Sequence, residues 1–88
     1  MNCEVRIPSP LRSYTSGASC VAAHGATLEA ILADLDRRFP GIRFRMVDEQ
    51  QCIRPHMRLF VNTQAAATLQ QPVGEGDTVH VICALSGG

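Results

Sequence analysis

Residues 28–39 carry the strongest periodic pattern in this chain, and it is the pattern of a helix with one covered side. Apolar side chains recur at steps of three and four residues, namely Leu28, Ile31, Leu32, Leu35 and Phe39. Thr27 is placed to cap the first turn, and Pro40-Gly41 ends the pattern. The solvated side is expected to carry Asp34, Asp36, Arg37 and Arg38. A single helix of about twelve residues is marginal in water, so the rest of the chain must supply a sheet.

Two strands are predicted before the helix. Residues 2–7 alternate between apolar and polar side chains, with one face made of Cys3, Val5 and Ile7. Residues 18–23 form a weaker strand, and a loop through Tyr14 connects the two. We expect these strands to pair as a hairpin.

Two further strands are predicted after the helix, at residues 57–62 and 78–84. The turn-rich segment 72–77 leads into the last strand. Residues 42–46 alternate between apolar residues and arginine, so a short edge strand is expected there. Residues 65–69 are expected to form a turn of helix or a short connection.

This order of elements predicts an α+β fold, a mixed sheet with one main helix packed across one face. The helical crossover allows the last strand to lie parallel to the first. The 88 residues make one domain, residues 1–88. Residues 85–88 are expected to be a flexible C-terminal tail.

Charge and hydropathy exclude several classes of protein. The formal net charge is zero, which argues against binding of nucleic acid. No apolar run is long enough to span a membrane, and residues 1–6 do not resemble a signal peptide, so we expect a cytoplasmic protein. Residues 37–58 hold six arginines against Asp48 and Glu49. This segment fits either a docking surface for an acidic partner or a solvated loop.

The cysteines and histidines do not form a recognisable site. Cysteines 3, 20, 52 and 83 lack the spacing of a zinc or iron–sulfur centre, so no metal and no cofactor is expected. The predicted parallel strands place Cys3 and Cys83 too far apart for a disulfide. The histidines at 24, 56 and 80 have no evident catalytic companions.

The chain ends in Leu85-Ser86-Gly87-Gly88, which follows the last strand without a stop signal. Glycine has no Cβ, so Gly87 and Gly88 fit a channel too narrow for other residues. Four extended residues reach at most about 13–14 Å, enough to enter a neighbour's active site. The carboxylate of Gly88 is a poor electrophile by itself, and it becomes reactive only if a partner activates it.

Several short motifs together resemble one protein family from end to end. They are Ile7-Pro8 with Leu11-Arg12, Thr27-Leu28 with Leu32 and Leu35, Phe60-Val61-Asn62, Gly76-Asp77-Thr78-Val79 and Ser86-Gly87-Gly88. In this order they resemble the ubiquitin-like β-grasp sulfur carriers of the MoaD/ThiS family. The opening and the length look closest to the carrier of thiocarboxylate-dependent cysteine biosynthesis. Cys83-Ala84 and Thr63-Gln64 depart from the family's pattern, so molybdopterin, thiamine or a sulfur-containing secondary metabolite remains open as the end product.

The resemblance implies a carrier and not an enzyme. An ATP-dependent activating enzyme would adenylate the Gly88 carboxylate, and a sulfur donor would displace AMP to leave a thiocarboxylate. A second, sulfur-accepting biosynthetic enzyme would then consume that sulfur. Gly88 is the reactive residue, with Gly87 and Ser86 threaded behind it, and the free protein is expected to be a monomer.

Two other classes remain open. One is a ubiquitin-like modifier joined through Gly88 to lysines of target proteins. The other is a non-catalytic β-grasp binding module, for example for RNA, although the neutral charge and few aromatic residues argue against RNA.

A docking surface is predicted from strand alternation. Leu59 and Val61 are assigned to the core, so Phe60 points outward, and by the same rule Ile82 points outward. Phe60, Ile82 and Leu85 would form one apolar patch at the root of the tail, which binds the partner enzyme. If the two faces are reversed, Phe60 and Ile82 are core residues instead.

Overall fold

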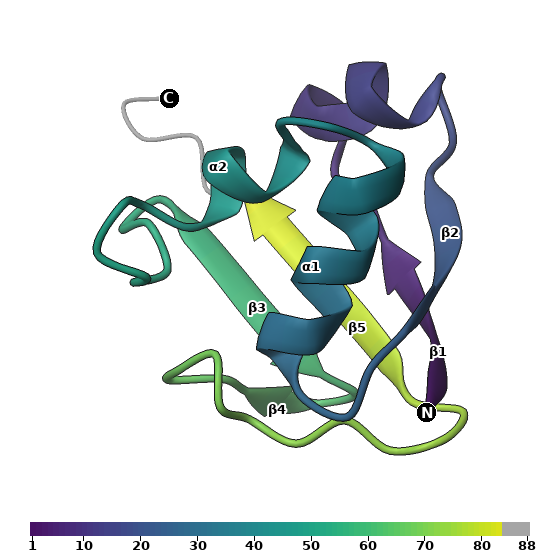
Figure 1. Cartoon of the computed structure of the whole chain (residues 1–88), viewed down its shortest axis with the longest axis vertical. Helices are drawn as coiled ribbons and strands as arrows, with labels where there is room; N and C mark the ends of the chain where they lie inside the picture. Colours follow the sequence, from purple (N-terminus) through teal and green to yellow (C-terminus); the bar gives the residue numbers. More distant parts are fainter. Residues whose placement is uncertain (84–88) are drawn as a thin grey trace.

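The computed structural model describes residues 1–83 of the chain. Its elements are β1 (Asn2–Arg6), the 3₁₀ helix η1 (Ser9–Thr15), β2 (Cys20–His24), α1 (Leu28–Arg38), α2 (Ile42–Met46), β3 (Met57–Val61), β4 (Gln64–Ala65) and β5 (Thr78–Cys83). Figure 1 shows α1 lying across one face of the sheet, with η1 and α2 at the end where β1 and β5 terminate. Within residues 1–83, the helices are too short and too polar to cross a membrane.

The five strands form one mixed sheet in the order β2-β1-β5-β3-β4. β1 pairs antiparallel with β2 and parallel with β5, with Glu4 opposite Thr78. The predicted hairpin, the parallel central pair and the α+β class are therefore confirmed. The register ends at Arg6 opposite His80, so Cys83 lies beyond the end of β1, far along the sheet from Cys3. Both cysteines are free thiols.

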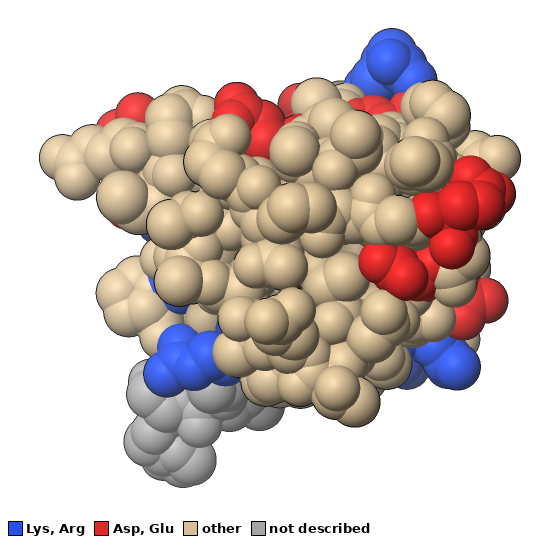
Figure 2. All heavy atoms as spheres, turned by 90° about the horizontal axis from the view of Figure 1, so that it is seen from below, with Lys and Arg blue, Asp and Glu red and all other residues tan. Residues whose placement is uncertain are grey.

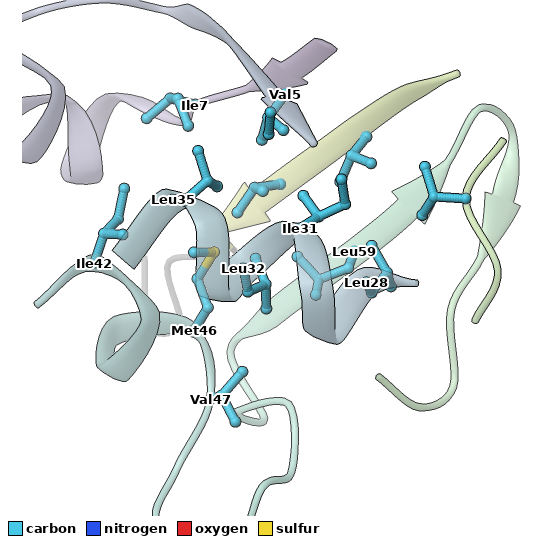
Figure 3. Packing of buried hydrophobic residues seen from close by; sticks show 14 of the residues in the cluster. Val5, Ile7, Leu28, Ile31, Leu32, Leu35, Ile42, Met46, Val47 and Leu59 are labelled. Carbon is cyan, nitrogen blue, oxygen red and sulfur yellow. The ribbon is translucent and has the colours of Figure 1, made fainter. Parts of the chain in front are cut away.

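The core lies between α1 and the sheet, as the helical periodicity predicted. Figure 3 shows side chains from α1, α2 and the strands meeting in this layer. Leu28, Ile31, Leu32 and Leu35 are fully buried, and burial stabilises the fold by about 1.5–3 kcal/mol for each such side chain. The Thr27 hydroxyl accepts the N–H of Ala30 at 3.2 Å, which confirms the predicted cap.

Asp34 is not on the solvated side of the helix, where the sequence placed it. It is buried, and its carboxylate accepts the backbone N–H of His24 at 3.0 Å. Arg37 and Arg38 both pair with this carboxylate, and Arg38 also donates to the carbonyl of Ala22. β2 is an edge strand, whose outward N–H and C=O groups lack a neighbouring strand. The expectation was wrong because α1 runs along this edge and its polar side chains cover it.

The pKa of Asp34 reflects this environment. Burial disfavours the charged form, but the N–H of His24 and the charges of Arg38 and Arg37 outweigh it, so the pKa of Asp34 is lowered. We call Asp34, Arg37 and Arg38 the Asp34 cluster. It joins α1 to β2, and its single carboxylate pairs with two arginines.

Residues 42–46 form the short helix α2, so the predicted edge strand is wrong. Ile42 and Met46 are four residues apart, which places both on one helical face, and both are fully buried. Gly41, at φ +95°, turns the chain into this helix. Asp36 fixes the turn by accepting the N–H groups of Gly41 and Arg43 at 3.1 Å. Residues four apart lie on one face both in a strand and in a single helical turn, so the sequence pattern did not distinguish the two structures.

The segment after β1 is also more regular than predicted. Residues 9–15 form η1 and not an open loop, and Leu11 and Thr15 are its buried residues. Pro8 precedes the helix in extended conformation, and the Arg12 side chain folds back, its Nε donating to the carbonyl of Ile7 at 3.0 Å. η1 therefore closes the end of the core where β1 terminates.

The start of β5 is fixed by side chains from the end of β3. Asn62, at φ +56°, donates from Nδ2 to Asp77 at 3.1 Å and accepts the N–H of Thr78 at 3.0 Å. Asp77 in turn accepts the N–H of Gly74 at 2.7 Å, and these hydrogen bonds lower its pKa. The expected helical turn or connection at 65–69 is partly replaced by β4, which pairs with β3.

Candidate functional site

The candidate site surrounds the end of β5, from which the predicted tail continues. β5 ends at Cys83, which pairs with Met57 at the start of β3. Leu85, Ser86, Gly87 and Gly88 lie outside the described residues.

The sheet face opposite α1 carries Phe60 and Ile82, on the side predicted from alternation. Leu59 and Val61 are buried against the helix, and Ile82 is 46% exposed. Phe60 is partly exposed and pairs with His80, whereas Ile82 pairs with Arg58. Phe60 and Ile82 are therefore diagonal neighbours on adjacent strands, a distance that large side chains span. The reversed assignment of the two faces is excluded.

A polar hollow of about 370 Å³ adjoins this face near the end of β1. Its lining includes the cationic side chains of Arg6 and Arg12, together with His80 and Ser19. Arg6 pairs with Glu4 at 3.4 Å. The hollow thus places positive charge on the sheet side of β5, within two residues of Ile82.

On the helix side of the same strand end, two hollows of about 340 and 200 Å³ share Arg45 and His56. The larger one is lined by Pro10, Leu11, Ser13, Tyr14, Arg45, His56, Met57 and Cys83, and the smaller one by Phe44, Arg45, Arg54 and His56. Arg45 donates from Nε to the hydroxyl of Tyr14 at 2.7 Å, and this bond raises the pKa of Arg45. Arg54 donates from Nε to the carbonyl of Phe44 at 2.7 Å and stacks on its ring.

We call Tyr14, Phe44, Arg45, Arg54 and His56 the Arg45–Arg54 surface. The sequence indicated it only through the density of arginines between residues 37 and 58. It left open whether this segment is a docking surface or a solvated loop, and by expecting a strand at residues 42–46 it did not bring Arg45 to Tyr14.

Charge is distributed unequally between the two ends of the molecule. Arg12, Arg45 and Arg54 lie near the end of β5. At the other end, Glu75 and Asp77 lie in the loop before β5. Figure 2 looks at that other end, whose middle carries uncharged groups, with Asp and Glu groups along its upper and right sides and Arg groups toward its rim. β5 therefore ends where these arginines gather.

The thiols and imidazoles do not converge on a reactive centre. Cys3 is buried, which raises its pKa and disfavours the reactive thiolate. Within residues 1–83, no group of three or more His, Cys, Asp and Glu side chains is arranged to hold a metal ion.

The chain matches the ThiS family over residues 5–88. It is 33% identical to the sulfur carrier protein CysO of Mycobacterium tuberculosis over 93 aligned positions, which cover all of both chains.

Two solved structures resemble it closely. The crystal structure of Mycobacterium tuberculosis CysO superposes with a TM-score of 0.88 at 30% identity, covering 94% of this chain and 99% of that one. The crystal structure of the Amycolatopsis orientalis BexX/CysO complex contains a chain with a TM-score of 0.90 at 34% identity, covering 98% of this chain and 99% of that one. These similarities extend over the whole sheet and its helices.

Proposed function

The chain belongs to the ThiS family, and on that premise we propose that it is a sulfur carrier protein whose C-terminal Gly88 carries the sulfur. The observation that supports this most is the full-length similarity to a sulfur carrier, which includes the Gly-Gly end. The predicted β-grasp resemblance and the order of strands agree with it.

The chemistry takes place on the terminal carboxylate. A carboxylate oxygen of Gly88 attacks the α-phosphorus of ATP within an activating enzyme, and pyrophosphate leaves. The resulting acyl adenylate has a good leaving group, so a sulfur nucleophile adds to its carbonyl carbon and expels AMP. With hydrosulfide as the nucleophile, loss of its proton leaves a thiocarboxylate directly; with a donor persulfide, the acyl disulfide that forms is cleaved by a thiol, and the donor leaves as a disulfide with that thiol. The thiocarboxylate supplies sulfide to a second, biosynthetic enzyme.

In this scheme the protein is a co-substrate of its partner enzymes and not itself an enzyme. Gly87 and Ser86 occupy the narrow part of the partner's channel, where the missing Cβ of glycine matters. Fixing the tail's backbone costs about 1–2 kcal/mol per residue, and its own side chains offset little of that cost. Docking of the folded domain must supply the rest.

We assign that docking to the outer sheet face around Phe60 and Ile82, with Leu85 as its continuation. Ile82 is exposed beside the start of the tail, and Phe60 is its diagonal neighbour. Full burial of such a side chain contributes about 1.5–3 kcal/mol. Because Phe60 is already partly buried and Ile82 is 46% exposed, the area that they still expose offsets part of the ordering cost.

Deletion of Gly88 tests the reactive terminus. The full chain is incubated with activating enzyme, ATP and a sulfur donor, and intact-mass analysis should show one oxygen replaced by sulfur in the wild type only. The deletion variant should retain the wild-type melting temperature, since no core residue changes. Equal thiolation of both proteins would contradict the proposal.

Phe60→Glu and Ile82→Glu test the docking face. Both variants should stay folded and bind the activating enzyme at least tenfold more weakly, because a carboxylate would have to be desolvated in the interface. Ala33→Glu, on the exposed side of α1, is the matched control and should bind normally. Normal binding by the two sheet variants would remove this face from the interface.

The same proteins and reagents distinguish a sulfur carrier from a protein modifier and from a binding module. A modifier would produce covalent adducts larger than the chain on a denaturing gel. A binding module would function equally well without Gly88. We expect neither result.

A further inference from the structure

The Arg45–Arg54 surface lies on the opposite side of β5 from Phe60 and Ile82, yet it also borders the root of the tail. Its larger hollow is lined by Cys83, the last described residue, and by Met57, which pairs with Cys83. Figure 1 shows α2 beside the end of β5. A partner that takes in the tail therefore comes close to this surface.

The arginines of this surface are held in place by neutral groups. Arg45 is fixed by the Tyr14 hydroxyl and Arg54 by the Phe44 carbonyl, and each guanidinium lies over an aromatic ring, at 5.9 Å and 4.5 Å from the ring centre respectively. Within residues 1–83, these side-chain hydrogen bonds use Nε alone. Among the described residues, the two terminal nitrogens of each guanidinium have no hydrogen-bond acceptor, so they are available to bond to water or to a partner. Two parallel N–H donors of this kind match a carboxylate end-on.

The charge of this surface is not neutralised by the domain. The ion pairs among residues 1–83 are Arg6–Glu4, Arg37–Asp34 and Arg38–Asp34, and none involves Arg45 or Arg54. Two neighbouring acids are occupied otherwise, since Asp36 and Asp48 accept backbone N–H groups. Among residues 1–83, Arg45 and Arg54 therefore form no ion pair.

The composition of the surface favours a protein partner over nucleic acid. Phe44 is 57% exposed, and aromatic residues with arginine are enriched at protein interfaces. Base stacking requires an open aromatic face, and Arg54 already covers one face of the Phe44 ring at 4.5 Å. The formal net charge of zero also weakens non-specific attraction to phosphates.

We propose that the Arg45–Arg54 surface is a second docking surface, which binds Asp and Glu side chains of the partner enzyme around the entrance that receives the tail. This inference rests on the proposed function, because insertion of the tail is what brings the acidic surface to these arginines. The root of the tail then has apolar contacts on one side and charged contacts on the other. Arg45 and Arg54 are docking residues and take no part in the chemistry at Gly88.

The first test uses a defined probe. A decapeptide of glutamate is titrated into the ¹⁵N-labelled full chain, with a glutamine decapeptide and deca-thymidylate as comparisons. We expect amide shifts centred on residues 43–46 and 54–57 with the glutamate peptide alone, decreasing as salt is added. Arg45→Gln/Arg54→Gln should lose these shifts, whereas Arg37→Gln should keep them, because Arg37 already pairs with Asp34.

Three results would overturn the proposal: no shifts, shifts centred elsewhere, or tighter binding of deca-thymidylate, which would make this a nucleic-acid surface. The Gly88 deletion variant should bind the peptide normally. This variant separates the two proposals. Its loss of thiolation tests the sulfur-carrier function, whereas its binding of the glutamate peptide tests only the Arg45–Arg54 surface.

The second test uses the enzyme that thiolates the wild-type chain. Arg45→Gln/Arg54→Gln should raise KM for the carrier about 5- to 10-fold and leave kcat unchanged, as expected for lost charge-assisted contacts that act in binding only. Arg37→Gln should change neither constant. An unchanged KM in the double variant, with normal thiolation of the wild type, would contradict the second docking surface alone.

Discussion

The Asp34 cluster and the Arg45–Arg54 surface use the same residue type in opposite ways. In the Asp34 cluster, two arginines of α1 share one buried carboxylate, and Arg38 also binds the edge of β2. On the Arg45–Arg54 surface, each arginine is held by a neutral oxygen and an aromatic ring. In the Asp34 cluster, the arginines pair with a carboxylate of the same domain. On the Arg45–Arg54 surface, they bond only to neutral groups among the described residues, so they can pair with a partner.

The difference shows that the number of arginines in a segment does not predict which of them are free to bind a partner. Residues 37–58 looked like one basic segment in the sequence. The fold divides it, because Arg37 and Arg38 lie one turn after Asp34 on α1, whereas Arg45 and Arg54 meet Tyr14 and Phe44 at the other side of the core. The comparison predicts that variants of the first group change stability and variants of the second group change binding.

The largest expected effect on stability comes from Asp34→Ala. The substitution leaves the His24 N–H and two arginines without their acceptor, so we expect a loss of about 2–3 kcal/mol in the free energy of unfolding. Chemical denaturation would measure it. Below the lowered melting temperature the variant should still bind the activating enzyme normally. A variant that is fully stable but binds poorly would reverse the roles of the two regions.

A pH dependence of stability should follow from the lowered pKa of Asp34. Because the folded-state pKa lies below the ordinary value of 3.8, the contribution of Asp34 is complete above that value and is lost as the pH falls through the folded-state pKa. The effect should be smaller than that of Asp34→Ala, since a protonated carboxyl still accepts the His24 N–H. Denaturation at about pH 7 and about pH 3 should show a smaller difference between wild type and Asp34→Asn at the lower pH. A constant difference would mean that the pKa of Asp34 is the same in the folded and unfolded states.

The smallest expected effects on stability come from single substitutions of Arg38 and Arg54. Arg38→Gln removes hydrogen bonds to Asp34 and Ala22 and should cost about 1 kcal/mol of stability. Arg54→Gln removes one exposed bond to a carbonyl and a stacking contact, so about 0.5 kcal/mol is expected. Thermal denaturation of both variants in parallel would measure the contrast. Equal losses would show that the Arg45–Arg54 surface is as structural as the Asp34 cluster.

Much of the fold was predictable because its signals are local. The period of 3.6 residues identified α1 and its buried stripe, and the hydroxyl of Thr27 identified its start. The period of two placed Leu59 and Val61 inside and Ile82 outside, since successive side chains of a strand alternate. These patterns depend on neighbours within a few residues, so the sequence alone carries them.

Tertiary structure decided what depends on contacts between distant segments. Ile42 and Met46 suit one face of either a helical turn or a strand, and it is burial against the core, with Asp36 at the start, that selects α2. The sequence predicts a solvated Asp34, but in the fold its carboxylate accepts the backbone N–H of His24 in β2. Arg45 becomes a fixed cation only because Tyr14, thirty-one residues earlier, meets it at the end of β5. The sequence determined the sheet, the helix and the Gly-Gly end, whereas the fold determined which of its charges remain free to meet a partner, because charge compensation depends on which side chains the folded chain brings together.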